Sequence, residues 1–62
     1  MKAYRVYLEA RPQGTRQSYA VALFDVKAVD QYDAFRLAVE EARRSKLEAR
    51  DPLQVTQIAL PP

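Results

Sequence analysis

The chain opens with an alternation of apolar and polar residues that is typical of a half-buried β-strand. Across residues 3–11, AYRVYLEAR, one side holds Tyr4, Val6, Leu8 and Ala10. The other side holds Arg5, Tyr7, Glu9 and Arg11. The pattern therefore predicts a strand with one face against a core and one face toward solvent.

A turn and a second strand follow. The segment RPQGTRQ contains Pro12 and the only glycine of the chain, Gly14, so it is interpreted as a turn. The next segment, SYAVALFDVKAV (residues 18–29), is strand-like, and the short connection predicts an antiparallel hairpin. Unlike the first strand, it is largely apolar on both alternating sets. Something must therefore cover its second face.

A helix is predicted from Gln31 to about Leu47, where Ala, Leu, Glu and Arg are frequent. Asp30 occupies the N-cap position, and Asp33 in the first turn favours the positive end of the helix dipole. The expected core stripe consists of Tyr32, Phe35, Val39 and Ala42, with Ala38 and Ala49 beside it. Leu37 falls nearly opposite that stripe, and Pro52 is expected to break the helix within EARDP, residues 48–52.

A third strand, LQVTQIAL, is predicted over residues 53–60. The order β-β-α-β indicates a single small α+β domain over residues 1–62, with one helix on one face of a three-stranded, mostly antiparallel sheet. The third strand lies either beside the first, antiparallel, or beside the second, parallel, and we favour the first arrangement. Its apolar residues Leu53 and Val55 are in one phase, whereas Ile58 and Leu60 are in the other. This change predicts either a bulge near Thr56 and Gln57 or an apolar contribution of the last residues to the outer face.

One hairpin register places like residues on like faces. On the helix side it pairs Tyr4 with Val26, Val6 with Phe24, Leu8 with Ala22, and Ala10 with Ala20. On the outer side it pairs Arg5 with Asp25, Tyr7 with Leu23, and Arg11 with Tyr19. The centre of the outer face is then apolar, and its candidate partner-binding residues are Tyr7, Tyr19, Val21 and Leu23.

Size and composition favour association. A chain of 62 residues buries only about 60% of the surface that its unfolded form exposes, and this one has no Cys and no His to supply disulfides or common zinc ligands. The apolar outer face has three interpretations: scattered surface residues, a self-association surface on the face or on the exposed edge of YAVALF, or a site for another protein. We favour self-association as a homodimer, in which one patch covers its own copy.

The strand directions also predict a basic end. The helix should finish at the same end as the hairpin turn, which gathers Arg11, Arg16, Arg43, Arg44, Lys46 and Arg50. Such a cluster could grip nucleic-acid phosphates or an acidic protein. It could equally be ordinary helix surface, because Arg36–Glu40, Glu40–Arg44 and Arg44–Glu48 have the spacing of ion pairs and the net charge is only +2.

The sequence offers little for catalysis or for a cofactor. Without His or Cys, and with one glycine, the usual acid–base, thiol and phosphate-loop arrangements are absent. No signal peptide follows Met1 and no apolar run suits a membrane, so we expect a cytoplasmic protein without membrane, metal, cofactor or small-molecule partner. The segment KAVDQYDAFRLAVEEAR resembles pieces of small phage- or plasmid-borne accessory proteins and antitoxin-like domains, and no residue role is carried over from it. The function expected is a non-enzymatic interaction module of regulatory or accessory type, with nucleic-acid binding as the alternative.

Overall fold

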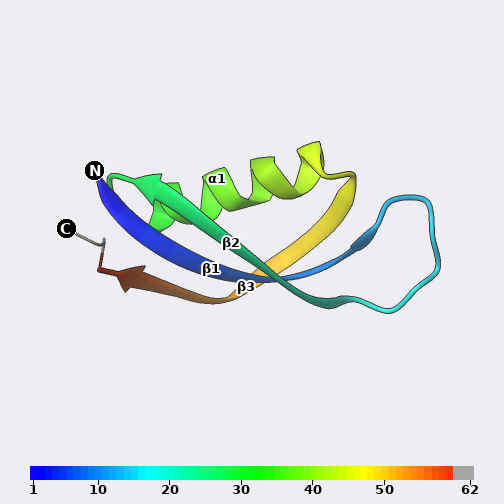
Figure 1. Cartoon of the computed structure of the whole chain (residues 1–62). Coiled ribbons are helices and arrows are strands. Elements are labelled where there is room, and N and C mark those ends of the chain that lie inside the picture. The colour runs from blue at the N-terminus through cyan, green and yellow to red at the C-terminus, as the bar shows by residue number, and fades with distance from the viewer. Residues whose placement is uncertain (60–62) are drawn as a thin grey trace.

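The computed structural model describes residues 1–59 and consists of a three-stranded sheet and one helix (Figure 1). The elements are β1 (Lys2–Pro12), β2 (Ala20–Ala28), α1 (Gln31–Arg44) and β3 (Leu47–Ile58). The strand order is β2-β1-β3 and both pairings are antiparallel. The α+β architecture and the favoured strand order are therefore confirmed. We call the face covered by α1 the inner face and the opposite one the outer face.

The hairpin register is the one that the sequence predicts. On the inner face the partners are Tyr4–Val26, Val6–Phe24, Leu8–Ala22 and Ala10–Ala20. The regular ladder reaches from Lys2 opposite Ala28 to Ala10 opposite Ala20. A one-residue slip would turn the buried residues of β1 to solvent, and this cost fixes the pairing.

The core lies between β1 and an alanine stripe on α1. Val6 and Leu8 are fully buried, and the buried helix residues are Ala34, Ala38 and Ala42. Alanines at this spacing share one helix face and let the helix backbone approach the sheet closely. Larger side chains flank the stripe and are partly buried: Phe35, Leu37 and Val39.

The predicted helix face was therefore wrong in two respects. Tyr32 was expected in the core but is 78% exposed, and Leu37 was expected opposite the core but packs against it. The sequence interpretation placed the largest apolar side chains at the centre of the stripe. In the fold the smallest residues take that place, which rotates Tyr32 outward and brings Leu37 to the margin of the sheet.

The helix begins as predicted and ends early. The Asp30 carboxylate accepts a hydrogen bond from the Asp33 backbone N–H at 2.8 Å, and the Asp33 carboxylate accepts one from the Val29 N–H at 3.3 Å. The last helical residue is Arg44, not Leu47, because Ser45 caps the helix and Lys46 takes a left-handed conformation with φ 58°. The chain reverses there, so EARDP is part of β3 and not a helix break.

β3 is an irregular edge strand. Its register against β1 shifts between Tyr7 and Leu8 and again between Leu8 and Ala10, around the Leu8–Pro52 pair. Proline has no N–H for the ladder, so it is tolerated in edge strands and at bulges. The bulge predicted near Thr56 and Gln57 is wrong, because both residues pair in regular register there.

The phase change falls where the sequence places it, between Val55 and Ile58, and of the two alternatives the structure supports an apolar contribution to the outer face. Val55 lies opposite Val6 on the inner face, and Ile58 lies opposite Ala3 on the outer face. Ala49, which was expected beside the helix stripe, lies in β3 opposite Ala10. Leu60 falls outside the described residues.

Candidate functional site

The centre of the outer face carries a strip of apolar side chains. Tyr7 of β1 lies opposite Leu23 of β2 and, on its other side, opposite Gln54 of β3. Val21 precedes Leu23 by two positions, so the two side chains project from the same face. Val21 is 62% exposed and Leu23 is 51% exposed, whereas Tyr7 is half-buried. The structure therefore brings together three of the four residues that the sequence proposed for partner binding.

The strip reaches the open edge of the sheet at β2. Within residues 1–59, β2 pairs with β1 and with no other strand, and α1 lies on the inner face. The outer side chains of β2 and its unpaired backbone edge are thus presented together. This combination distinguishes β2 from β1, which is paired on both sides.

Tyr19, the fourth proposed residue, has a different environment. It lies just before β2, and its ring is contacted by two guanidinium groups, those of Arg11 at 4.9 Å and Arg50 at 4.4 Å from the ring centroid. These are cation–π distances. Tyr19 continues the row of Val21 and Leu23, but it joins the strip to the basic end and its side chain is half-buried.

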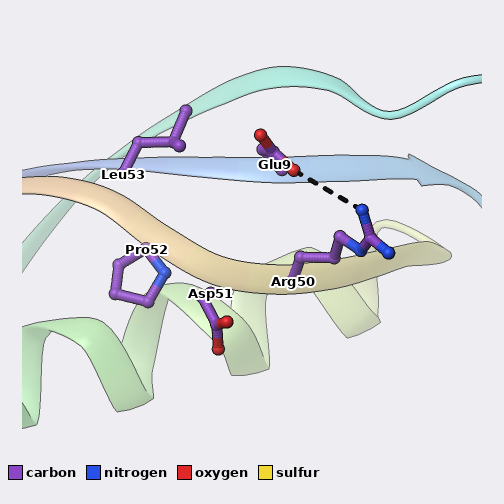
Figure 2. A pocket seen from close by; sticks show the side chains of 5 residues that line it. All are labelled: Glu9, Arg50, Asp51, Pro52 and Leu53. Carbon is purple, nitrogen blue, oxygen red and sulfur yellow. Dashed lines mark ion pairs between the residues drawn. The ribbon is translucent and has the colours of Figure 1, made fainter.

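Leu53 is a further residue of the strip, one that the sequence interpretation placed in phase with Val55. The register shift beside Pro52 removes it from that phase, and it is 53% exposed. In Figure 2, Leu53 and Glu9 lie on one side of β3, whereas Asp51 and Pro52 lie on the side of the helix. The proline inside a strand-like segment was the signal that could have indicated this irregularity.

A shallow depression of about 430 Å³ separates the strip from the basic end (Figure 2). Its lining residues are Glu9, Arg50, Asp51, Pro52 and Leu53. The Arg50 guanidinium lies 3.9 Å from the Glu9 carboxylate, across β3 and β1. The lining combines both signs of charge with one exposed leucine, which suits a contact surface better than an enclosed ligand site.

At the other end of the strip, Arg5 and Asp25 form a bidentate ion pair. Arg5 donates from Nε and Nη2 to the two carboxylate oxygens of Asp25, at 2.9 and 3.1 Å. This is the cross-strand pair that the register predicts. The hydrogen bonds from Arg5 lower the pKa of Asp25 below its ordinary value of 3.8. The strip is thus bounded by charge at both ends.

The hairpin connection and the C-terminal end of α1 lie at the same end of the molecule, as the strand directions predict (Figure 1). The Gln13 backbone N–H donates to the Lys46 carbonyl at 2.9 Å, so the start of the hairpin connection is joined to the turn that follows α1. Three of the six cations predicted at this basic end have a carboxylate partner: Arg11 bonds Glu48 at 2.8 Å, Arg44 bonds Glu41 at 2.7 Å, and Arg50 lies near Glu9. Of the three predicted helix pairs, only Arg36–Glu40 is formed, at 2.9 Å. Arg44 turns to Glu41 and Glu48 to Arg11, because β3 begins before Glu48.

The other three cations remain exposed: Arg16, Arg43 and Lys46. Within residues 1–59 they form no ion pair. Arg16 belongs to the hairpin connection, and the other two belong to the end of α1 and its cap. An incoming anion would meet these cations without first displacing a carboxylate of the described chain.

Comparison with known proteins does not assign a function to this chain. No family model, curated protein or solved structure matches this chain. Residues 1–59 hold no cluster of acidic side chains suited to a metal ion, and none of their helices has the length and hydropathy to cross a membrane.

Proposed function

We propose that this protein is a non-enzymatic interaction module that forms a homodimer and binds another macromolecule. The observation that supports this proposal most directly is the pair Val21 and Leu23, two strongly exposed apolar side chains on the same face of the open edge strand. Tyr7 and Leu53 extend the same strip toward β3. Strand edges and apolar patches of this kind are sites of association when they are not protected by charge or proline.

The size of the domain supports the same proposal. Within residues 1–59 a single helix covers only the inner face of the sheet, and the fully buried large side chains are Val6 and Leu8. A chain of this length gains stability from association when it lacks disulfides and metals. Association through β2 would place the outer side chains of β2 beside those of a second copy, and would shield part of their surface without another element from the chain.

Substitution of one valine tests the proposal, and the chain offers a matched control. Val21→Asp places a charge in the strip, whereas Val29→Asp places the same charge at a position of similar exposure, 62% against 64%, outside the sheet. Sedimentation equilibrium should give a dimer for the wild type and for Val29→Asp. Val21→Asp should weaken the dimer at least about tenfold, equivalent to roughly 1.4 kcal/mol. A monomeric wild type across the concentration range would contradict the homodimer.

A second candidate function is nucleic-acid binding at the basic end. The observation that favours it is the trio Arg16, Arg43 and Lys46, which is exposed and forms no ion pair within residues 1–59. Arginine offers a planar fork to phosphate oxygens, and a lysine adds a point charge. Binding through these groups would be strongly salt-dependent, since phosphate contacts release counterions.

Charge reversal distinguishes this candidate from the first. Arg43→Glu combined with Arg44→Glu should abolish binding to fluorescently labelled DNA or RNA at low salt while leaving the oligomeric state unchanged. Arg36→Glu provides a control on the same helix, because Arg36 is engaged by Asp33 and Glu40 away from this end. Wild-type protein that binds no duplex or single strand at low salt would contradict the candidate.

A further inference from the structure

We propose that two copies of this chain join through their β2 edges, antiparallel, with a two-fold axis beside Ala22, into one continuous sheet. The inference rests on the homodimer of the proposed function and specifies the surface and the register. Both helices would lie on the same face of the joined sheet. Val21 and Leu23 of the two copies would then form one apolar surface on the opposite face.

The two edges of the sheet differ in their capacity for such pairing. β3 carries Pro52 and two register shifts, features that protect an edge from another strand. β2 pairs with β1 in regular register throughout Ala20–Ala28, with no proline and no charge from Ala20 to Phe24. Strand addition requires an open run of backbone donors and acceptors, and the described chain offers such a run at β2.

The side chains of β2 select the register. In an antiparallel pair, residues directly opposite share a face, so the two-fold axis must pass beside one residue. An axis at Ala22 sets Val21 opposite Leu23 of the second copy on the outer face. On the inner face it sets exposed Ala20 opposite half-buried Phe24 of the second copy. Apolar side chains therefore lie opposite each other on both faces, and on the inner face the small Ala20 lies opposite the large Phe24.

The registers centred at Leu23 and Phe24 are less favourable even though they pair a longer stretch. An axis at Leu23 sets Val21 opposite Asp25 of the second copy, and an axis at Phe24 sets Leu23 opposite that carboxylate. Each arrangement brings a charged group against an exposed apolar side chain, with the desolvation cost that this carries. With the axis at Val21, only Ala20, Val21 and Ala22 of each copy would pair, because β2 begins at Ala20.

Charge complementarity supports the Ala22 axis. Continued one residue beyond the start of β2, this register places Asp25 of one copy opposite Tyr19 of the other, and the Tyr19 ring is contacted by Arg11 and Arg50. The side chain of Asp25 is 51% exposed although Arg5 binds it, so its carboxylate can meet a second cation. The two-fold axis creates this contact twice. Opposite charges facing each other across an interface favour one register over its neighbours.

Cysteine cross-linking tests the register directly, because the chain contains no cysteine and any introduced thiol is unique. With the axis at Ala22, the two Ala22 Cα atoms would lie about 5 Å apart, within the range that a disulfide spans. The two Ala20 Cα atoms would lie more than about 13 Å apart, beyond that range. Under mild oxidation, Ala22→Cys should form a covalent dimer and Ala20→Cys, on the same face of the same strand, should not.

The oligomeric state of the wild type distinguishes a failure of the homodimer from a failure of the β2 register. A monomer in sedimentation equilibrium would overturn the homodimer and this inference together. A dimer in which Ala22→Cys does not cross-link, or in which Ala20→Cys cross-links equally well, would overturn the β2 register and leave the homodimer standing. Hydrogen exchange on the wild type decides the case if a variant fails to fold: β2 amides should gain protection as the protein concentration rises, and unchanged exchange contradicts edge pairing.

Discussion

Leu8 lies opposite Pro52, and the β1–β3 ladder shifts its register on both sides of this pair. Leu8 is fully buried, and Pro52 is half-buried. The proline cannot donate to the ladder, so the edge strand bulges around it while its ring still lies opposite the core leucine. This pair therefore joins a fully buried core residue to the least regular strand, and the irregularity beside it directs Leu53 to the outer face (Figure 2).

Leu8→Ala should be among the most destabilising substitutions in the chain. Truncation of a fully buried leucine costs about 2–5 kcal/mol, a large share of the stability of a small domain. Leu53→Ala removes the same atoms from a residue that is 53% exposed and should change the free energy of unfolding much less. Urea unfolding of both variants compares the two positions. Equal losses would show that Leu53 is packed in solution.

The orientation of α1 is tested by one substitution in its buried alanine stripe and one at Tyr32, which the sequence pattern places in the core. Ala38→Leu inserts volume against the sheet and should cost about 1–3 kcal/mol, because Ala38 is fully buried. Tyr32→Ala should cost little, because Tyr32 is largely exposed. Thermal unfolding monitored by circular dichroism measures both. A large loss for Tyr32→Ala would restore the orientation expected from the sequence, in which Tyr32 belongs to the core stripe and Ala38 lies beside it.

Removal of the helix N-cap should destabilise the fold locally. Asp30→Ala leaves the Asp33 backbone N–H without its acceptor and should cost about 1 kcal/mol. Asp51→Ala removes the same side chain from an exposed position in β3 and serves as the matched control. Chemical unfolding at neutral pH gives the two values. A cost no larger than that of the control would contradict a stabilising role for this cap.

The Asp33 carboxylate should contribute to the acid sensitivity of the fold. The hydrogen bond from Arg36, followed by that from the Val29 N–H, lowers the pKa of Asp33 below its ordinary value of 3.8. A carboxyl whose pKa is lower in the folded state stabilises the fold above its unfolded pKa and loses that contribution as the pH falls through the folded value. Stability should therefore decline below about pH 4, and Asp33→Asn should reduce the decline.

A pH series of urea unfolding curves measures this contribution. The control is Asp51→Asn, since Asp51 forms no ion pair within residues 1–59. The decline for Asp51→Asn should follow the wild type. An Asp33→Asn variant with an unchanged decline would place the acid sensitivity in other carboxylates, of which Asp25 is the next, because Arg5 lowers its pKa in the same way.

Local patterns predicted the parts of the fold that rest on local physics. The alternation in β1 and the position of Gly14 give the hairpin and its register, and the register in turn gives the Arg5–Asp25 pair. Asp30 followed by strong helix formers gives the start of α1. In each case the favourable arrangement can be evaluated from neighbouring residues or from a single strand pair.

The features that escaped prediction depend on several elements at once. The end of α1 is set by the left-handed turn at Lys46, which lets residues from Leu47 onward join the sheet rather than continue the helix. The face of α1 is set by how closely a helix can approach the sheet, and this favours Ala34 and Ala38 over Tyr32. The environment of Tyr19 requires Arg11 and Arg50 to come from two different strands.

The sequence by itself determined the architecture, the hairpin register, the helix start and the gathering of cations at one end, because periodicity, capping and chain direction act over short distances. Only the tertiary structure decided which cations form ion pairs with carboxylates within residues 1–59, and which apolar side chains are exposed. Those outcomes depend on where β3 bulges and how α1 rotates. Both are compromises between core packing and backbone pairing that become defined only when all four elements meet.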